Sequence, residues 1–479
     1  MYQRIFQQGL TQFICTSTCL FLFSSCANII PPGGGPRDTI APKLVMAVPK
    51  DSATGVTADR ITLTFDEFVD IKQLNENLIV SPNPKTQPVV DYRLRNVYIR
   101  LRDSLLPNTT YAFNFGNAIV DVNEGNPAKG FTYAFTTGKV LDDNTFKGKV
   151  QLAETGKIDS TLIVLLHRNL NDTAVVKERP LYYTKINGKG EFTFRYLPSG
   201  RFNVFVLPND YGKKYDDSTK MFAFLPEPIN IISTGTSPVT LYAFEEAKRK
   251  EKPKPVVTND AEPAIKGNNP ERKPSPYIRT LPNLENGAQD VLSNMQINLS
   301  KKITSMDTNG IRLTDTLFKP FSGFTLQLDS NRSSIIVKYP WKTDQQMMLL
   351  IAKEALKDSL GNTLAKTDTI RFRTKKESEY GAIKIRITNL DLNRNPVLQF
   401  VQNDKLVESV PMRSKELVRK LYKPGEYELR ILYDRNQNGI WDSGNYRTKQ
   451  QPEIVVQLAK KLAVRPNWDN EVDLSLSNE

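Results

Sequence analysis

The chain has 479 residues, of which 39% are hydrophobic and 24% charged, with one histidine, three cysteines and a formal net charge of +13. This composition is that of a folded protein, and at about 100 to 200 residues per domain the length predicts about three to five domains. One imidazole cannot supply the histidine pairs of most zinc sites and leaves a single candidate for a histidine-based triad, so the sequence favours several modules over one compact enzyme.

The first 25 residues have the pattern of a secretory signal. Arg4 is the only early charge, an apolar stretch ends at Leu20–Phe23, and the small pair Ser24–Ser25 precedes Cys26. The apolar stretch is too short, and too interrupted by Ser and Thr, to be a permanent membrane-spanning helix. The sequence therefore predicts that residues 1–25 are a signal peptide and that the protein is exported.

Small residues immediately before a cysteine resemble a bacterial lipobox, in which the new N-terminal thiol is lipidated after cleavage. The alternative is an ordinary signal peptide that contains cysteine, but Cys26 would then remain as a lone exposed thiol in an exported protein. We therefore expect lipidation at Cys26 and a tether over residues 26–40, where Pro and Gly prevent a regular element. Some surface-exported lipoproteins carry acidic residues directly after the lipidated cysteine, but none follows Cys26. We therefore expect a lipid anchor on the periplasmic face of the outer membrane.

Beyond the tether, apolar residues recur at every second position, as in half-buried antiparallel strands. Ile61, Leu63 and Phe65 show this alternation, and turn formers separate such runs. About seven strands within residues 41–138 predict a sandwich of the immunoglobulin type. The runs ITLTFDEFVD, LLPNTTYAFNF and FTYAFTTG resemble the bacterial Ig-like domain of the surface-layer (SbsA) type, a resemblance that implies a building block without catalysis.

A second module is expected over residues 145–244. Its run GEFTFRYLPSGRFNVFVLPND resembles the prealbumin-like sandwich of collagen-adhesin B-type repeats and carboxypeptidase regulatory-like domains, which again implies a structural role. The turn from Pro198 to Gly200 would let two strands pair, because glycine can take a positive φ angle. The residues that carry the resemblance are Gly190, Phe192, Phe194, Leu197, Pro198, Gly200, Phe202 and Val204.

Residues 246–276 are rich in Pro and Lys and poor in large apolar residues, which predicts a basic, Pro-rich linker. After the linker the order of patterns repeats: MQINLSKKI corresponds to ITLTFDEFV, and YKPGEYELRILYD corresponds to LPSGRFNVFVLPN. We therefore expect a second, divergent Ig-like module over 277–375 and a second prealbumin-like module over 380–477. The predicted fold class is all-β, with tandem Ig-like and prealbumin-like sandwiches in a two-module unit that occurs twice.

The sharpest local motif starts at Asp434, where oxygen-bearing residues stand at positions one, three, five and nine and Gly439 stands at position six, as at the start of an EF-type calcium loop. Position twelve is Asn445 instead of the bidentate Glu, and strands flank the motif. A hairpin held by Asn and Asp side chains bonded to their own backbone explains the same residues. The sequence therefore predicts at most a weak Ca²⁺ site and no other cofactor. Its ligands would be Asp434, Asn436, Asn438, the carbonyl of Ile440, and Asp442.

Residues typical of catalysis do not form a recognised arrangement. His167 ends an apolar run without a recognised nucleophile nearby, which is typical of a packing or surface residue. The pair Asp66–Glu67 could serve a glycosidase, but adjacent residues of a strand point to opposite faces. No Gly-rich phosphate loop, serine elbow or zinc spacing is visible. The sequence thus predicts a protein that is not an enzyme and has no small-molecule substrate.

The positive charge is spread over four modules, so it would attract anionic lipid or polysaccharide without specifying either, and nucleic acid is not expected as a partner. The whole order, from CANIIPPGGGPRDTIAP to VRPNWDNEVDL, resembles Ig-like domain lipoproteins of Bacteroidota envelopes. This resemblance implies a non-catalytic scaffold or accessory subunit of an outer-membrane assembly or secretion complex, with an outer-membrane or periplasmic protein complex as its partner. The alternative is a surface adhesin that binds glycan or matrix protein.

Overall fold

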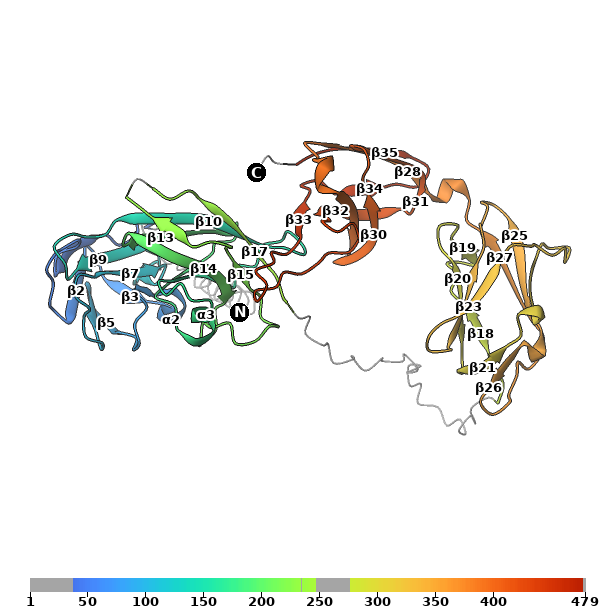
Figure 1. The fold of residues 1–479 in the computed structure, drawn as a ribbon, viewed down its shortest axis with the longest axis horizontal. Helices are drawn as coiled ribbons and strands as arrows, with labels where there is room; N and C mark the ends of the chain where they lie inside the picture. Colours follow the sequence, from blue (N-terminus) through green and yellow to red (C-terminus); the bar gives the residue numbers. More distant parts are fainter. Residues whose placement is uncertain (1–37, 234, 247–275, 477–479) are drawn as a thin grey trace, which may run out of the picture. The chain divides into compact units, whose positions relative to one another are not determined.

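A computed structural model describes residues 38–233, 235–246 and 276–476 of the chain (Figure 1). The predicted signal peptide, Cys26, most of the 26–40 tether and nearly all of the 246–276 linker lie outside the described residues. The chain divides into two compact units, Met1–Asp142 and Asp143–Glu479. The all-β prediction is confirmed, since strands and turns dominate both units. Within the described residues, none of the helices has the length and hydropathy that a membrane-spanning helix needs.

The first unit contains the first Ig-like module, whose strands form the sheets β1-β2-β6-β5 and β4-β7-β9 and the pair β3-β8. Alternation places aromatic rings between the sheets: Phe113, Tyr133 and Phe135 have no exposed surface. Its elements are β1 (Leu44–Val48), β2 (Arg60–Phe65), β3 (Val69–Ile71), α2 (Leu74–Asn77), β4 (Ile79–Ser81), β5 (Val89–Arg93), β6 (Asn96–Arg100), β7 (Thr110–Gly116), β8 (Ile119–Asp121) and β9 (Phe131–Thr136).

The second unit begins with the residues predicted to form the first prealbumin-like module. They form a three-stranded sheet, β13-β10-β17, and a five-stranded sheet, β12-β11-β14-β15 with β16 also on β14. Strand β11 is apolar at nearly every position and buried along its whole length, so both faces of its sheet are covered. The elements are β10 (Asn144–Leu152), β11 (Leu162–His167), α3 (Ala174–Lys177), β12 (Tyr182–Lys185), β13 (Glu191–Leu197), β14 (Gly200–Pro208), β15 (Ala223–Phe224), β16 (Ile229–Ile231) and β17 (Val239–Ala243).

The residues predicted to form the second Ig-like module have the sheets β18-β20-β24-β23 and β19-β27-β25-β22 and the pair β21-β26. Its core is mainly aliphatic and includes Trp341 and Phe372, whose rings meet edge-to-face with centroids 5.8 Å apart. Its elements are β18 (Thr280–Pro282), β19 (Ala288–Gln289), β20 (Met295–Leu299), β21 (Ile303–Met306), η1 (Thr308–Gly310), β22 (Ile311–Thr314), β23 (Thr325–Leu328), β24 (Ser334–Lys338), β25 (Gln346–Ile351), η2 (Lys353–Ala355), β26 (Leu356–Asp358) and β27 (Asp368–Thr374).

The residues predicted to form the second prealbumin-like module have the sheets β31-β28-β35 and β30-β29-β32-β33, with β34 also on β32. This is the strand order of the first prealbumin-like module, including the parallel pair of β28 with β35, which corresponds to that of β10 with β17. Its elements are η3 (Glu377–Glu379), β28 (Gly381–Thr388), η4 (Leu392–Arg394), β29 (Pro396–Gln402), β30 (Lys405–Pro411), β31 (Glu416–Tyr422), β32 (Gly425–Tyr433), β33 (Ile454–Gln457), β34 (Leu462–Val464) and β35 (Asp469–Ser475).

Residues at corresponding positions of the repeated sequence pattern, Asp121 with Asp358 and Gly200 with Gly425, form matching turns. Asp121 and Asp358 are both buried at the end of a short strand, and each carboxylate accepts backbone N–H groups of the turn that follows, including that of Asn126 and of Asn362. Gly200 and Gly425 have φ angles of 142° and 152°, a region that favours glycine. The two copies of each motif are therefore used in the same way, to close a turn.

Candidate functional site

The predicted calcium motif is a self-capped turn that follows β32. Asp434 is only 1% exposed, and its carboxylate accepts the N–H of Gly439 at 2.7 Å and that of Asn438 at 3.3 Å. The amide groups of Asn436 and Asn438 both donate to Oδ2 of Asp442, at 2.7 and 2.8 Å. The structure thus brings four of the five predicted ligand residues together in one network.

Ile440 contributes to the turn through its backbone, since its N–H donates to Oδ1 of Asn438 at 2.7 Å while its side chain is 67% exposed. No group of three or more His, Cys, Asp or Glu side chains among the described residues is arranged to hold a metal ion. The turn offers two carboxylates, those of Asp434 and Asp442, and a bound Ca²⁺ ion would need neutral oxygen ligands in addition. Calcium binding at Asp434 stays a prediction from the sequence.

A residue that the sequence motif did not include closes the turn from the other side. Glu453 is 2% exposed, and its carboxylate accepts the N–H of Arg435 at 2.7 Å and that of Asp442 at 3.1 Å. The indole N–H of Trp441 donates to the carbonyl of Glu453 at 2.7 Å. Glu453 therefore joins both ends of the turn to the start of β33. The sequence shows the Pro-Glu-Ile motif at residues 452–454, but nothing in it indicates that the Glu453 carboxylate is buried.

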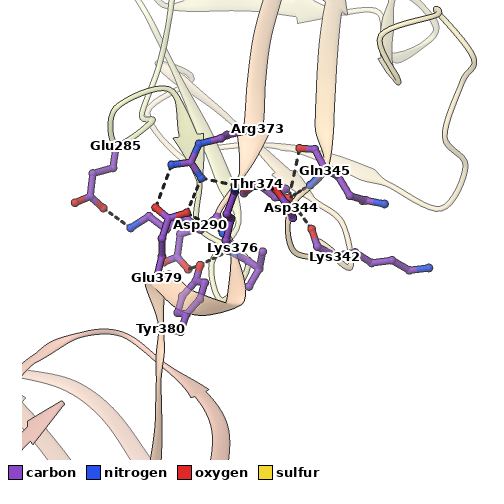
Figure 2. Close-up of polar contacts among 12 residues, drawn as sticks. Glu285, Asp290, Lys342, Asp344, Gln345, Arg373, Thr374, Lys376, Glu379 and Tyr380 are labelled. Atoms are coloured by element: carbon purple, nitrogen blue, oxygen red, sulfur yellow. Dashed lines mark hydrogen bonds and ion pairs between the residues drawn. The ribbon is translucent and has the colours of Figure 1, made fainter. Parts of the chain in front are cut away.

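A second polar cluster connects the second Ig-like module to the second prealbumin-like module (Figure 2). The buried hydroxyl of Tyr380 donates to Asp290 at 2.7 Å and accepts the N–H of Val291 at 2.9 Å. Asp290 also forms an ion pair with Lys423. Burial alone would raise the pKa of the Asp290 carboxyl, but the hydrogen bonds from Lys423 and Tyr380 outweigh it and lower the pKa. The carboxylate is therefore charged and bonded to both modules.

The chain segment that enters the second prealbumin-like module is fixed as well. Arg373 donates through both terminal nitrogens to Glu379, at 2.5 and 3.1 Å, and Glu379 also accepts the N–H of Lys376 at 2.8 Å. Arg373 first, and then this N–H, lower the pKa of Glu379 to about 2. A bidentate pair restricts orientation more than a single contact does. Figure 2 shows these side chains around the turn between β27 and β28.

Replacing Tyr380 with phenylalanine should loosen this junction. The substitution leaves the Val291 N–H without an acceptor and removes one donor from the Asp290 carboxylate, so we expect a cost of about 1–3 kcal/mol. Hydrogen exchange at residues 290–292 should accelerate accordingly. The control is Tyr211→Phe, because the Tyr211 side chain is 91% exposed. Equal exchange in the two variants would contradict the role given to the Tyr380 hydroxyl.

The single histidine is a packing residue, as one of the two sequence interpretations has it. His167 is 2% exposed at the end of β11, and its ring meets the edge of Phe205 at 5.8 Å. Its Nε2 atom has no hydrogen-bond partner among the described residues. Burial lowers the pKa of His167 from 6.5 to about 4, against a smaller opposing effect of Glu178.

Asp66 and Glu67, the other candidate catalytic pair, lie just beyond β2, and the Asp66 carboxylate accepts the N–H of Lys43 at 2.8 Å.

The burial of His167 predicts a specific pH dependence. Above pH 6.5 the imidazole is neutral in both the folded and the unfolded chain, so it has no effect on stability. As the pH falls from about 6.5 to about 4, the unfolded chain binds a proton that the folded chain does not, and up to about 3 kcal/mol of stability is lost. Because His167 is the only histidine, NMR of a sample without a histidine tag would show one imidazole. A titration midpoint near pH 4 is expected, and one near 6.5 would contradict the burial.

The model of a family described as bacterial Ig-like domain matches residues 38–137, the region of the first nine strands. Residues 38–137 are a bacterial Ig-like domain. The predicted resemblance of this module to that family is thereby confirmed. No curated protein matches the sequence.

Three solved structures illustrate what the fold is similar to. The major pilin subunit BcpA of Bacillus cereus is 10% identical, with a TM-score of 0.16, over 70% of this chain and 100% of that chain. The TIE protein of Bacillus anthracis is 10% identical, with a TM-score of 0.17, over 94% and 76%. The surface-layer protein SbsC is 12% identical, with a TM-score of 0.17, over 90% and 54%. Similarities this low carry no argument about function.

Proposed function

We propose that the protein is a non-catalytic outer-membrane lipoprotein that serves as a scaffold or accessory subunit of an envelope assembly or secretion complex. The observation that carries the proposal is the junction at Asp290. Consecutive domains normally move relative to one another unless their interface fixes them. Here a buried tyrosine, a bidentate Arg–carboxylate pair and a carboxylate bonded to both modules restrict the junction. Restricted junctions suit a protein that holds partners at set positions.

The edges of the second prealbumin-like module offer places where a partner could add a strand. Strands β30 and β31 each lie at the end of a sheet. They expose apolar side chains, with Leu406 56%, Val407 52% and Val418 60% exposed. Backbone groups at a sheet edge can pair with an added strand, which is one of the recurring modes of peptide recognition. Affinity purification from detergent-solubilised membranes should then yield a stoichiometric envelope protein, and its absence would count against the scaffold.

The proposed anchor rests on the lipobox-like residues before Cys26. Metabolic labelling with an alkyne fatty acid should mark the protein, and Cys26→Ser should abolish the label and release the protein from the membrane fraction. Cys19→Ser is the matched control, because Cys19 lies within the predicted signal peptide and should leave labelling unchanged. Labelling that survives Cys26→Ser would exclude this anchor.

The rival function, a surface adhesin, differs in which face of the membrane the modules occupy. Protease added to intact cells should leave the protein whole if the modules face the periplasm. Digestion on intact cells would favour the adhesin, and the purified protein should then bind glycan or matrix protein. Permeabilised cells give the positive control, since the protease must be able to digest the chain once the outer membrane is opened.

A further inference from the structure

One segment of the second prealbumin-like module lies against the first prealbumin-like module. This segment, residues 443–451, is called the arm here, and it extends from the Asp434 turn before β33 begins. The ring of Tyr446 is 9% exposed and meets the rings of Phe222 and Phe224 edge-on, each with centroids 5.1 Å apart. The rings of Phe205 and Tyr215 lie at 5.8 and 6.3 Å. Tyr446 thus occupies an aromatic site made by the other module.

Polar groups of the arm also find partners in the first prealbumin-like module. The hydroxyl of Tyr446 donates to the carbonyl of Asp172 at 3.0 Å, and the Lys449 ammonium pairs with the Asp172 carboxylate at 2.6 Å. Gln451 donates to the carbonyl of Phe224 at 3.1 Å, and Ser443 donates to that of Glu245 at 2.6 Å. A buried tyrosine whose ring is packed and whose hydroxyl is bonded is typical of an interaction hot spot.

Two glycines permit the close approach. A Cβ atom on Gly444 would lie 2.6 Å from the ring of Phe244, closer than a carbon atom can stand. Behind the arm, a Cβ atom on Gly156 would lie 2.7 Å from the carbonyl oxygen of Val455. The N–H of Val455 donates to the carbonyl of Ala153 at 2.9 Å. These contacts join the arm and β33 to several separate segments of the first prealbumin-like module, so the contact is not confined to one side chain.

The first prealbumin-like module has an apolar face that its own sandwich core does not use. Leu162, Val164 and Leu166 of β11 belong to that core. Because successive strand residues face opposite sides, Ile163 and Leu165 point the other way, and they are 1% and 0% exposed. Phe205 and the aromatic site of Tyr446 lie on this second face. A sheet with two apolar faces requires a cover on each, and the arm forms part of the second cover.

We propose that the arm and this aromatic face form an intramolecular clasp, which joins the two prealbumin-like modules directly and independently of the peptide segment between them. The role of the self-capped Asp434 turn is then to hold the base of the arm. The proposal goes beyond the scaffold function and does not depend on it, because it concerns a contact within one chain.

The test is to cut the chain between the modules. A cleavage site for a specific protease is inserted after Asp260, in the predicted linker of the full-length protein, and the cut protein is examined by size-exclusion chromatography with light scattering. We expect the two fragments to migrate as one particle with the mass of the uncut chain. Tyr446→Ala should weaken their association at least about 30-fold, the effect of truncating a hot-spot aromatic residue. Arg447→Ala, at the neighbouring exposed position of the arm, should leave it unchanged.

A second variant guards against a trivial loss of folding. Gly444→Val forces a side chain against the ring of Phe244 without removing a buried side chain, and it should also separate the fragments. Circular dichroism should show unchanged strand content in both variants. Separation of the unmutated fragments at micromolar concentration would overturn the clasp. A particle of twice the mass before cutting that Tyr446→Ala converts to a monomer would overturn the intramolecular assignment, because the arm would then bind a second copy.

Discussion

Replacing Gly148 with alanine is expected to destabilise the first prealbumin-like module by about 3 kcal/mol, the upper part of the range for overpacking a core. Gly148 lies in β10, at the centre of the three-stranded sheet, between Phe192 of β13 and Val239 of β17. A Cβ atom there would lie 2.3 Å from the Val239 carbonyl oxygen and 2.6 Å from the Phe192 ring. A backbone carbonyl in a paired strand cannot move aside, so β17 must separate or the ring must leave the core.

The matched control is Gly188→Ala in the same module, since a Cβ atom on Gly188 meets nothing within 4 Å. Its effect should stay within about 0.5 kcal/mol. Because a chain of several modules does not unfold in a single step, the measurement is hydrogen exchange of peptides that cover β10 and β17. Similar exchange in the two variants would show that Gly148 is not at a closely packed position.

Replacing Glu453 with alanine is the second change with a large expected effect, about 2–6 kcal/mol on the second prealbumin-like module. The reason is that two backbone N–H groups, those of Arg435 and Asp442, lose their buried acceptor, at about 1–3 kcal/mol for each unsatisfied group. Hydrogen exchange should accelerate over residues 434–453 in this variant. The same variant should weaken the clasp, because the turn no longer holds the base of the arm.

The control is Glu426→Ala, which removes a carboxylate of the same module that is 63% exposed and paired with Lys461. Exposed ion pairs contribute about 0–1 kcal/mol, so little change is expected. If both variants lost equal stability, the buried position of Glu453 would have no special role.

Adding calcium to the unmutated protein tests the weak Ca²⁺ site that the sequence predicts at Asp434. Stabilisation of the protein by millimolar calcium, abolished by Asp434→Ala, would support that site.

The sequence predicted the fold class because period-two alternation and turn residues are local signals. Strand β2 alternates fully, and Gly200 adopts the positive φ angle expected of its turn. Asp121 and Asp358 also stand at corresponding positions of the repeated pattern, and they cap equivalent turns. The number of strands was harder to predict, because two- and three-residue strands such as β3 and β8 depend on pairing with distant residues.

The contacts between modules could not be read from the sequence. Tyr446 and Phe222 are 224 residues apart, and neither belongs to a spacing motif. Asp290, Tyr380 and Lys423 come from three separate turns, so nothing local marks them as one cluster. The one sequence signal of these contacts is the run TLIVLL at residues 161–166. Apolar residues at nearly every position indicate a strand that is covered on both faces.

In-cell photo-crosslinking tests the central claim, that the protein acts by contact with an envelope protein, most directly. A photoreactive residue would replace Val418, on the exposed edge strand β31, and for comparison Tyr211, whose side chain is 91% exposed in the first prealbumin-like module. The account predicts that at least one position yields a discrete adduct with an outer-membrane or periplasmic protein. If both positions react, the protein in the two adducts is the same. Adducts only with glycan or extracellular matrix, or no protein adduct from either position, would contradict it.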